Sequence, residues 1–452
     1  MKIIIAGAGK VGTMLTRWLV SEGHEIILVD RQKEVLETCS EKFDILAVQG
    51  NCAAVGTLKQ TGVEDSEVII AVTGSDEFNL LCCLTAHSLN PDIHTIARIR
   101  NPEYTEQVYN MQETFASSLA VNPEKDVARE IDKLLKYPGF LRRDTFAKGR
   151  AEIVELKVKP GSPLENISLM DLNNIVKSKV LVCAINRGGV VSAPSGEFVL
   201  QTGDHLFVTG SRDELTKMLK HIGVITRKVK SVMLCGGGKV GYYLAKILSE
   251  SGVEVELIER DLDRCEHLAE VLPGVSVVNG DASSQGFLES EGIQNCDAVV
   301  AITSFDEMNM IISLYAKNYG VNQVVTKVDH VDNHSIQDAI GLESVVCPKD
   351  LCCNHIVRYI RAMENKSGAA LSIHTFADGQ MEALEFKVDA DTKNIDVPLR
   401  DMQLKKGVLI ACITRGGKLI IPDGSSSYKV NDGIVVVKSG DENIGKINDI
   451  FV

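Results

Sequence analysis

The sequence lacks three features that would mark a membrane, secreted or nucleic-acid-binding protein. No apolar run approaches the roughly 18 residues that a membrane-spanning helix needs, so we expect no transmembrane segment. The apolar run after Lys2 is too short for a signal peptide and leads directly into a glycine turn. Lysine and arginine number 48 against 61 aspartate and glutamate residues, and the net charge of −13 disfavours binding to nucleic-acid phosphates. We therefore expect a cytoplasmic protein.

The cysteine patterns of metal sites and disulfide scaffolds are also missing. The chain has 12 cysteines but no Cys-x-x-Cys, and the adjacent pairs Cys82-Cys83 and Cys352-Cys353 suit neither a metal nor an ordinary disulfide. Most of the others lie in apolar runs, which predicts free buried thiols in a reducing compartment. His330 and His334 are four residues apart, but without a third ligand nearby we expect a solvated pair and no metal site.

Two catalytic signatures are absent from the sequence, Gly-x-Ser-x-Gly and His-Glu-x-x-His. These absences disfavour the hydrolases and metalloproteases that carry them, and we predict no catalytic residues. At 452 residues the chain is nevertheless too long for one ordinary core, so several domains are expected.

What the sequence does contain is a nucleotide-binding pattern over residues 1–30. A β-branched run, Ile3–Ile5, is followed by Gly7, Gly9 and Gly12 in the spacing Gly-x-Gly-x-x-Gly. The first glycine permits a tight turn, the second allows a pyrophosphate to approach the backbone, and the third lets the helix pack on the strand. The residues that follow repeat at helical spacing on one face: Val11, Met14, Leu15, Trp18 and Leu19. A second apolar run ends at Asp30, which is placed to accept hydrogen bonds from ribose hydroxyls.

These residues also indicate the class of ligand. The backbone N–H groups of the glycine turn and the start of the helix should face phosphates. Lys10 either adds charge there or is simply solvated. An acid at position 30 disfavours a 2′-phosphate, so NAD or an adenine nucleotide fits better than NADP.

The same stretch occurs a second time. Gly236, Gly238 and Gly241 repeat the fingerprint 229 positions later, and Glu259 falls where Asp30 does. The apolar helix face recurs at the same offset, so the repeat is a whole folding unit. We therefore predict two nucleotide sites in one chain.

The remaining pattern of the first copy alternates strands and helices. We expect strands over 45–48, 68–72, 95–99 and 115–121, and helices over 31–42 and 76–89, the latter with Ser75 or Asp76 as its N-cap. This alternation predicts a doubly wound parallel sheet over about residues 1–122. The string Thr-x-x-Asp-Glu-x-Asn at 73–79 returns at 303–309 in the second copy.

A different kind of segment follows each copy. A helix over 124–136 is expected to stop at Pro138-Gly139, and from about residue 150 the pattern changes to strands and turns. We expect strands over 153–158 and over 198–208 with a break at 203–204, and a hairpin over 180–191. The end of the chain repeats this pattern at 385–388 and 408–417, and a basic stretch at 227–230 links the halves. The predicted domains are 1–123, 140–224, 229–348 and 368–452.

The chain resembles the TrkA-type regulatory proteins of bacterial and archaeal Trk potassium uptake systems. Those proteins carry two RCK (regulator of potassium conductance) modules, each a Rossmann-like nucleotide-binding domain followed by a small α+β domain. The resemblance spans essentially the whole length, and it rests on the duplication, the strings at 73–79 and 303–309, and the Arg-Gly-Gly hairpins at 187–189 and 415–417.

Three departures from the family pattern concern the sites. Asn51 replaces the usual aspartate after the third strand, whereas Asp281 keeps it. Lys327 stands where the first half has Arg98, and Gly237 adds a glycine to the second turn. These departures concern ligand identity and affinity at the two sites and leave the predicted fold unchanged.

The candidate nucleotide-contacting residues belong to the glycine turns, the acids and the carboxyl ends of the following strands. In the first copy they are Gly7, Ala8, Gly9, Lys10, Val11, Gly12, Asp30, Asn51, Thr73, Gly74 and Arg98. In the second copy they are Gly236, Gly237, Gly238, Lys239, Val240, Gly241, Glu259, Asp281, Thr303 and Ser304. For Asp76 and Asp306 two alternatives stay open, because each could cap a helix or contact the ligand. The resemblance implies that Arg98 reaches a phosphate or a neighbouring subunit; otherwise it pairs with a surface carboxylate.

The resemblance implies a non-catalytic regulatory subunit. It would bind NAD(H) and/or ATP/ADP and gate potassium uptake through a Trk-type membrane protein. It would act as a homo-oligomer, most simply a tetramer, on the inner face of the cell membrane. The alternative is an NAD-dependent oxidoreductase, which would need a proton donor and a substrate clamp beside the nicotinamide. No such group of residues stands out in the small domains, so we expect a protein that is not an enzyme.

Overall fold

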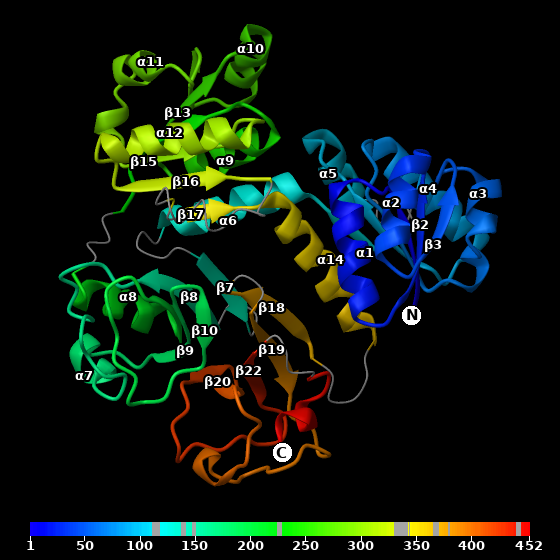
Figure 1. Ribbon diagram of the computed structural model, residues 1–452. Coiled ribbons are helices and arrows are strands. Elements are labelled where there is room, and N and C mark those ends of the chain that lie inside the picture. Colours follow the sequence, from blue (N-terminus) through cyan, green and yellow to red (C-terminus); the bar gives the residue numbers. More distant parts are fainter. Residues whose placement is uncertain are drawn as a thin grey trace. The chain divides into compact units, whose positions relative to one another are not determined.

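The computed structural model describes residues 1–110, 118–136, 142–146, 151–223, 228–329, 342, 344–364, 370–377, 380–439 and 444–452 (Figure 1). The chain divides into two compact units. The first comprises Met1–Asp132, Lys230–Asn333 and Val345–Val357, and the second comprises Lys133–Val229, His334–Ser344 and Arg358–Val452. Some sequence-based predictions lie outside the described residues: those for Phe115, Pro138, Gly139, Arg227, His330 and His334.

A six-stranded parallel sheet forms the centre of the first copy, as predicted. Its order is β3-β2-β1-β4-β5-β6. The strands are β1 (Lys2–Ala6), β2 (Glu25–Asp30), β3 (Leu46–Gln49), β4 (Val68–Ala71), β5 (His94–Arg98) and β6 (Leu119–Val121). The strand order runs from β1 outward to β3 and then, on the other side of β1, from β4 outward to β6. A crevice is expected at the carboxyl ends of the neighbouring strands β1 and β4, where this order reverses.

The helices of this copy follow from the apolar spacing. They are α1 (Lys10–Ser21), α2 (Lys33–Lys42), α3 (Val55–Gln60), α4 (Asp76–Leu89), α5 (Pro102–Asn110) and α6 (Pro123–Lys136), with a 3₁₀ turn η1 (Val63–Asp65). The Ser75 hydroxyl accepts a hydrogen bond from the Phe78 N–H at 3.2 Å, so Ser75 is the N-cap of α4. Helices α3 and α5 were not predicted, because each is short and α5 is largely polar.

The second copy repeats this topology in the order β14-β13-β12-β15-β16-β17. Its strands are β12 (Ser231–Cys235), β13 (Glu254–Glu259), β14 (Ser276–Asn279), β15 (Ala298–Ala301), β16 (Gln323–Lys327) and β17 (Ser344–Val346). Its helices are α9 (Lys239–Glu250), α10 (Leu262–Val271), α11 (Gln285–Ser290), α12 (Asp306–Asn318) and α14 (Pro348–Glu364), with η3 (Ile293–Asn295). The predicted duplication of the Rossmann-like sheet is therefore confirmed.

Within this unit, residues at the last helix of each copy contact the first helix of the other. The thiol of Cys353 in α14 lies 3.8 Å from the carbonyl oxygen of Val11 in α1. Asn122, just before α6, donates a hydrogen bond to the Tyr243 hydroxyl in α9 at 2.9 Å. Figure 1 shows α14 running beside α1. These contacts connect the two copies at equivalent places, which the sequence periodicity did not predict.

The second unit holds two five-stranded sheets that share apolar side chains. One has the order β10-β9-β11-β8-β7 and the other β18-β19-β22-β20-β21. The first contains β7 (Arg142–Phe146), β8 (Ala151–Lys157), β9 (Leu181–Arg187), β10 (Val190–Ser192) and β11 (His205–Gly210), with α7 (Leu172–Val176) and α8 (Arg212–His221). The second contains β18 (Ser372–Phe376), β19 (Met381–Lys387), β20 (Leu409–Arg415), β21 (Lys418–Ile420) and β22 (Gly433–Ser439), with η4 (Leu399–Asp401) and η5 (Ile447–Ile450). The rings of Phe207 and Phe376 lie 4.9 Å apart in the shared core.

The strand predicted over 198–208 is wrong in its first half. Strand β11 begins only at His205, and Val199 forms a single isolated bridge with Ser168. The Asp204 carboxylate accepts the Gln201 N–H at 2.8 Å, and this bond closes a turn at the break that was predicted over 203–204. Helix α8 was also missed, although the Ser211 hydroxyl caps it by accepting the Glu214 N–H.

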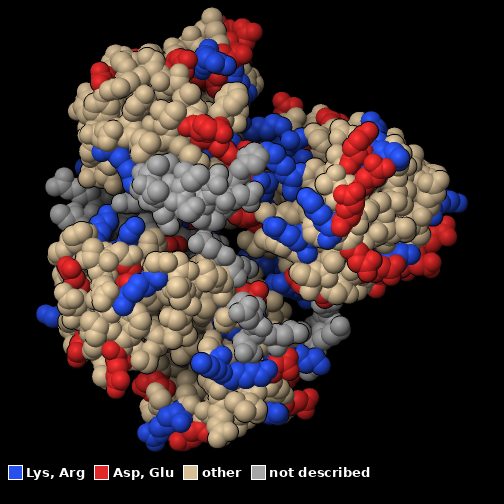
Figure 2. Space-filling view, viewed as in Figure 1, with Lys and Arg blue, Asp and Glu red and all other residues tan. Residues whose placement is uncertain are grey.

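The twelve cysteines are free thiols, eleven of them buried, as expected. On the face shown in Figure 2, acidic and basic side chains are interspersed over the surface. Among the described residues, no helix combines the length and the apolar character needed to cross a membrane.

Candidate nucleotide-binding sites

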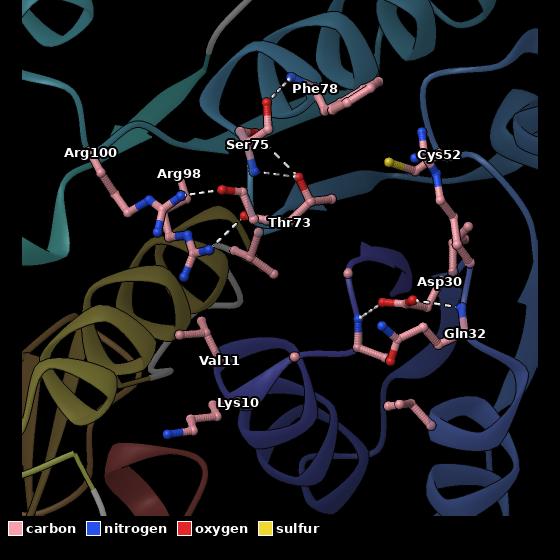
Figure 3. Close-up of a pocket in the computed structure, with 18 of the residues that line it drawn as sticks. Lys10, Val11, Asp30, Gln32, Cys52, Thr73, Ser75, Phe78, Arg98 and Arg100 are labelled. Carbon is pink, nitrogen blue, oxygen red and sulfur yellow. Dashed lines mark hydrogen bonds between the residues drawn. The ribbon is translucent and has the colours of Figure 1, made fainter. Parts of the chain in front are cut away.

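A cavity of about 780 Å³ lies at the carboxyl ends of β1, β2, β4 and β5 (Figure 3). It is the crevice that the strand order predicts. Its lining includes ten of the candidate residues of the first copy: Gly7, Ala8, Gly9, Lys10, Val11, Asp30, Asn51, Thr73, Gly74 and Arg98. The chain therefore brings residues from five separate segments to one edge of the sheet.

The three glycines of the first turn have different structural roles. Gly7 adopts a φ of +108°, and its N–H donates to the Val29 carbonyl oxygen at 2.8 Å. A Cβ on Gly9 would meet no atom within 4 Å, so the backbone there is open to an approaching group. A Cβ on Gly12 would lie 1.8 Å from the Gly7 carbonyl oxygen, so a side chain there would separate helix from strand. Gly12 thus lies under the turn and supports its packing.

The Asp30 carboxylate is fixed against this turn. One oxygen accepts the Ala8 N–H at 2.7 Å and the other accepts the Gln32 N–H at 2.9 Å. A carboxylate oxygen has room for a second donor, so both oxygens can still accept from ribose hydroxyls in the cavity. Asp30 therefore shapes the turn and lines the cavity at the same time.

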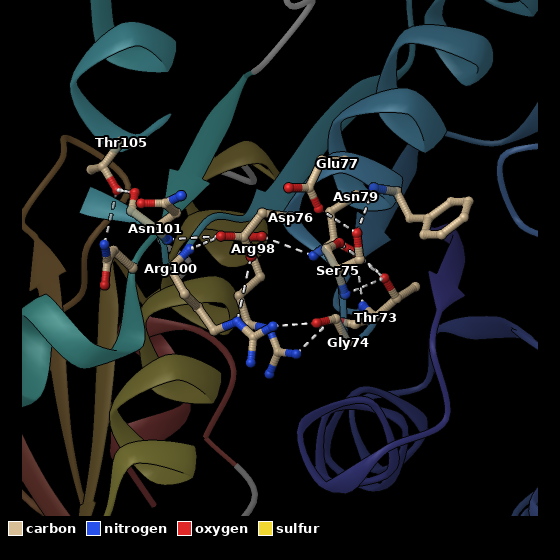
Figure 4. Close-up of polar contacts among 12 residues, drawn as sticks. Thr73, Gly74, Ser75, Asp76, Glu77, Asn79, Arg98, Arg100, Asn101 and Thr105 are labelled. Carbon is tan, nitrogen blue, oxygen red and sulfur yellow. Dashed lines mark hydrogen bonds and ion pairs between the residues drawn. The ribbon is translucent and has the colours of Figure 1, made fainter. Parts of the chain in front are cut away.

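The Thr-x-x-Asp-Glu-x-Asn string is a structural clamp (Figure 4). The side-chain oxygen of Asn79, which is fully buried, accepts both the Thr73 N–H at 2.8 Å and the Thr73 hydroxyl at 2.7 Å. Its amide donates to the Arg98 carbonyl oxygen at 2.8 Å. Asn79 therefore joins the turn after β4 to the end of β5. Thr73 was predicted to contact the ligand, and its hydroxyl group already has Asn79 as a partner.

Asp76 also serves the fold. It is buried and accepts the backbone N–H groups of Arg100 at 2.8 Å and Asn101 at 2.7 Å. The Arg100 guanidinium lies 3.4 Å from the same carboxylate. Asp306 repeats the arrangement by accepting the Asp329 N–H at 2.9 Å. Both aspartates hold the loop that follows the fifth strand, a role different from the ligand contact and the N-cap considered from sequence.

Arg98 contacts a backbone carbonyl group, and its contact with a phosphate or a neighbouring subunit stays a prediction. Its Nη2 donates to the Thr73 carbonyl oxygen at 2.5 Å, while its Nε is buried and has no hydrogen-bond partner among the described residues. Burial, and then the charge of Arg100, lower the pKa of Arg98. Arg100 donates to the Gly74 carbonyl oxygen, so two guanidinium groups lie side by side at one end of the cavity (Figures 3 and 4).

Sequence reasoning missed several residues of this cavity. The only sequence signal for Arg100 was its position two residues after Arg98, because side chains two residues apart in an extended chain lie on the same side. Glu124, Asp329 and Lys349 also line the cavity, although they lie far from the glycine turn in sequence. Burial raises the pKa of Glu124, an effect partly offset by a backbone hydrogen bond and the nearby cationic groups.

The second glycine turn reproduces the first. Gly236 has a φ of +124° and donates to Ile258 at 2.9 Å, and a Cβ on Gly241 would lie 2.2 Å from the Gly236 carbonyl oxygen. A Cβ on Gly238, next to the exposed Lys239, would meet nothing within 4 Å. The turn then enters α9, where Val240 is buried like Val11 in α1.

The extra glycine of this turn has a steric reason. Glu259 accepts the Gly237 N–H at 2.8 Å, the bond that Asp30 makes to Ala8. A Cβ on Gly237 would lie 2.6 Å from Leu268 Cδ1 and 3.0 Å from Glu259 Cβ. The glycine therefore makes room for Leu268 and for a glutamate, which is one methylene longer than an aspartate.

The other departures preserve local contacts. Lys327 Nζ donates to the Thr303 carbonyl oxygen at 3.1 Å, as Arg98 does to Thr73. The next residue, Ser304, is exposed in the turn, at the place of Gly74. Asp281 accepts the Ser283 N–H at 2.9 Å, and hydrogen bonds from Ser283 lower its pKa. Asn51 makes the same turn by accepting the Ala53 N–H at 3.2 Å.

No metal-binding cluster of three or more His, Cys, Asp or Glu side chains occurs in the described parts of the chain. The polar atoms gathered at the two sites are instead backbone N–H groups, a carboxylate and, in the first site, guanidinium groups. This combination suits a ligand with phosphates and a ribose.

The chain is similar to known proteins in sequence and in fold. The TrkA-N domain model matches residues 3–118 and 232–348, and the TrkA-C domain model matches residues 153–223. A Trk system potassium uptake protein TrkA homolog from Archaeoglobus fulgidus is 34% identical over 453 residues, covering 100% of both chains. The fold is similar to the GsuK RCK domain (TM-score 0.62, 20% identity, 97% of this chain and 92% of that one). It is also similar to the GsuK channel bound to NAD (TM-score 0.61, 19% identity, 97% and 77%).

The family match covers both Rossmann-like copies, and the relative from Archaeoglobus fulgidus is similar from end to end. The chain therefore belongs to the TrkA family of Trk system potassium uptake proteins.

Proposed function

We propose that this chain is a non-catalytic regulatory subunit that binds NAD(H) and/or ATP/ADP and gates potassium uptake through a Trk-type membrane protein. The observation that carries this proposal is the cavity of the first copy, in which an open glycine turn, Asp30 and the guanidinium groups of Arg98 and Arg100 share one lining. The second copy repeats the turn and the acid.

The proposed ligand contacts are those predicted from sequence, with Arg100 added in the first site. The backbone N–H groups around Gly9 and Gly238 would hold phosphates, and Asp30 and Glu259 would accept from ribose. We propose four domains with the boundaries 1–123, 140–224, 229–348 and 368–452. The fold similarity to a channel structure that contains NAD supports a nucleotide in this kind of fold.

We propose that the subunit acts from the cytoplasmic face of the membrane. A ligand shifts a conformational equilibrium only by its difference in affinity between two states. A hundredfold change in potassium flux would need about 2.7 kcal/mol of such difference. A few phosphate contacts spread over two sites per chain can supply that energy.

The experiment is potassium flux in vesicles that hold a Trk-type membrane subunit, with this protein added and ATP, ADP, NAD and NADH varied. We expect at least one nucleotide to change the flux. Asp30→Ala should weaken nucleotide binding by at least about 1 kcal/mol, because it removes hydrogen bonds to a charged group, and should move the response to higher nucleotide concentration.

Asp30→Asn provides a matched control, since it keeps the size and one acceptor oxygen. Its effect should be smaller than that of alanine. A protein that binds nucleotide yet never changes flux or co-purifies with the membrane subunit would contradict the regulatory role. A steady substrate-dependent change in NADH absorbance that Gly9→Ala abolishes would instead indicate an oxidoreductase.

A further inference from the structure

An exposed aromatic ring lines the first cavity. Phe78, in the first turn of α4, keeps 39% of its surface exposed and lies among the lining residues. The guanidinium carbon of Arg31 lies 4.8 Å from the centre of its ring. Arg31 directly follows Asp30 and is itself exposed, so it can move without disturbing the core.

The position of the Phe78 ring in the cavity corresponds to the base of a bound nucleotide. Phosphates belong at the glycine turn and the ribose at Asp30. The base then lies beyond Asp30, where Arg31, Cys52 and Phe78 line the wall. Figure 3 shows Asp30 and Cys52 on the side of the cavity opposite Arg98 and Arg100. The two ends of the cavity therefore differ: one is aromatic and thiol-lined, and the other carries the two guanidinium groups.

We propose that the first site recognises the base of its nucleotide by stacking it on the ring of Phe78, with the Arg31 guanidinium covering the other face. This inference rests on the proposed nucleotide binding and deepens it. The flat faces of a purine suit this arrangement, because aromatic rings and guanidinium planes both stack on bases. In the structure Arg31 covers the ring, so it would be displaced outward by the thickness of one base.

A surface cation–π pair is the simpler explanation, and it contributes about 0.5–1 kcal/mol at an exposed site. A cation–π pair that only stabilised the surface would not need to line the same cavity as the glycine turn. Phe78 and Arg31 come from different segments and both line the cavity that holds the glycine turn and Asp30. This shared location favours a role in binding.

The second copy lacks this arrangement. The aligned strings place Met308 at the position of Phe78, and Met308 is partly buried against the core. An aromatic residue appears three positions earlier instead, where Phe305 replaces the capping Ser75 and is 64% exposed. We therefore infer that the two sites treat the base differently and that stacking belongs to the first site.

The test uses 1,N6-etheno-ADP, a fluorescent adenine nucleotide whose emission reports stacking, and Phe78→Met, which installs the residue of the second copy. Stacking on an aromatic residue is worth about 1–3 kcal/mol per base, or roughly fivefold to a hundredfold in affinity. We expect Phe78→Met to weaken one of the two binding events at least about fivefold and to change its emission, and Phe78→Trp to preserve both.

Leu81→Met is the matched control, because Leu81 is an exposed apolar residue on the same helix that does not contribute to the cavity lining. It should bind the probe as the unmodified chain does. Equal affinity and emission in Phe78→Met and the unmodified chain would overturn the stacking inference while leaving nucleotide binding intact. If the unmodified chain binds neither etheno-ADP, ADP nor NAD, the proposed function itself fails.

Discussion

At the scale of single residues, the glycine fingerprint separates into positions that serve the ligand and positions that serve the fold. Gly9 and Gly238 face open space, whereas Gly12 and Gly241 lie directly against the carbonyl oxygens of Gly7 and Gly236. The same sequence motif therefore contains two kinds of constraint. Substitutions by alanine should tell them apart.

We predict that Gly9→Ala leaves the free energy of unfolding within about 0.5 kcal/mol of the unmodified value, because its φ of −70° suits alanine. The added methyl would meet an approaching phosphate, so nucleotide binding should weaken by more than about 1.4 kcal/mol, or tenfold. Gly12→Ala should instead lower the stability by about 1–3 kcal/mol through overpacking. Urea unfolding and titration calorimetry measure both effects, and a destabilised Gly9→Ala protein with normal affinity would contradict the assignment.

At the scale of elements, buried polar side chains hold together the loops at the carboxyl ends of the strands. Asn79 and Asn309 make equivalent bonds in the two copies: each accepts the N–H and hydroxyl of a threonine and donates to the end of the fifth strand. The loops that line the cavity depend on this clamp. The asparagine of the Thr-x-x-Asp-Glu-x-Asn string, which helped to identify the duplication, therefore has a structural role.

We predict that Asn79→Ala destabilises the chain by about 1–3 kcal/mol, because it leaves the Thr73 N–H and the Arg98 carbonyl group without their buried partner. Asn79→Asp keeps the acceptor and should cost less. Asn309→Ala, the matched change in the second copy, should have an effect of similar size. Urea unfolding of the three variants provides the comparison, and an unchanged midpoint for Asn79→Ala would refute the clamp.

The Arg-Gly-Gly hairpins have a comparable structural role. Arg187 donates to both oxygens of the buried Asp204 at 2.7 Å, and Arg415 contacts Asp432 at 2.7 Å. Burial alone would raise the pKa of Asp204, but the hydrogen bonds from Arg187 and the Gln201 N–H outweigh it and hold that pKa below its usual value. The arginine of this motif thus secures the strand that follows the hairpin.

A carboxyl whose pKa is lower in the folded state stabilises the fold above its unfolded pKa, which is about 3.9 for aspartate. That contribution is lost as the pH falls through the folded pKa. We therefore predict that Asp204→Asn lowers the midpoint of urea unfolding at pH 7 and reduces the loss of stability that the unmodified chain shows below about pH 4. Identical pH profiles for the two proteins would count against a stabilising ion pair.

At the scale of the whole molecule, each chain supplies two Rossmann-like copies and two small sheets. Closed symmetry is the usual arrangement of soluble homo-oligomers. We predict a tetramer, which would supply eight Rossmann-like domains, the number that the family resemblance associates with a gating ring. Light scattering at micromolar protein should give about four times the chain mass of 49.2 kDa. A mass equal to one chain under those conditions would rule the tetramer out.

The sequence by itself determined the β-α-β unit of residues 1–30, the start of α4 at Ser75 or Asp76 and the duplication of the Rossmann-like copies. Each of these depends on local spacing: a strand of period two, a helix of period 3.6, glycines at a turn and a cap beside a helix. Helix α5 was not predicted because it is short and largely polar. Helix α8 was not predicted, although its buried residues Leu215, Met218 and Leu219 repeat at helical spacing. The predicted break at 203–204 is confirmed, because β11 begins at His205, but the apolar residues from 198 onward do not form the strand predicted before that break.

The tertiary structure alone decided which distant segments meet. The bond from Asn79 to the end of β5, the neighbouring guanidinium groups and the contact of Cys353 with Val11 join residues that no local period relates. Lys349 and Asp329 line the first cavity although they belong to the second copy. Spacing along the chain determines which face of an element a side chain occupies. Its partners depend on how elements far apart in sequence pack together.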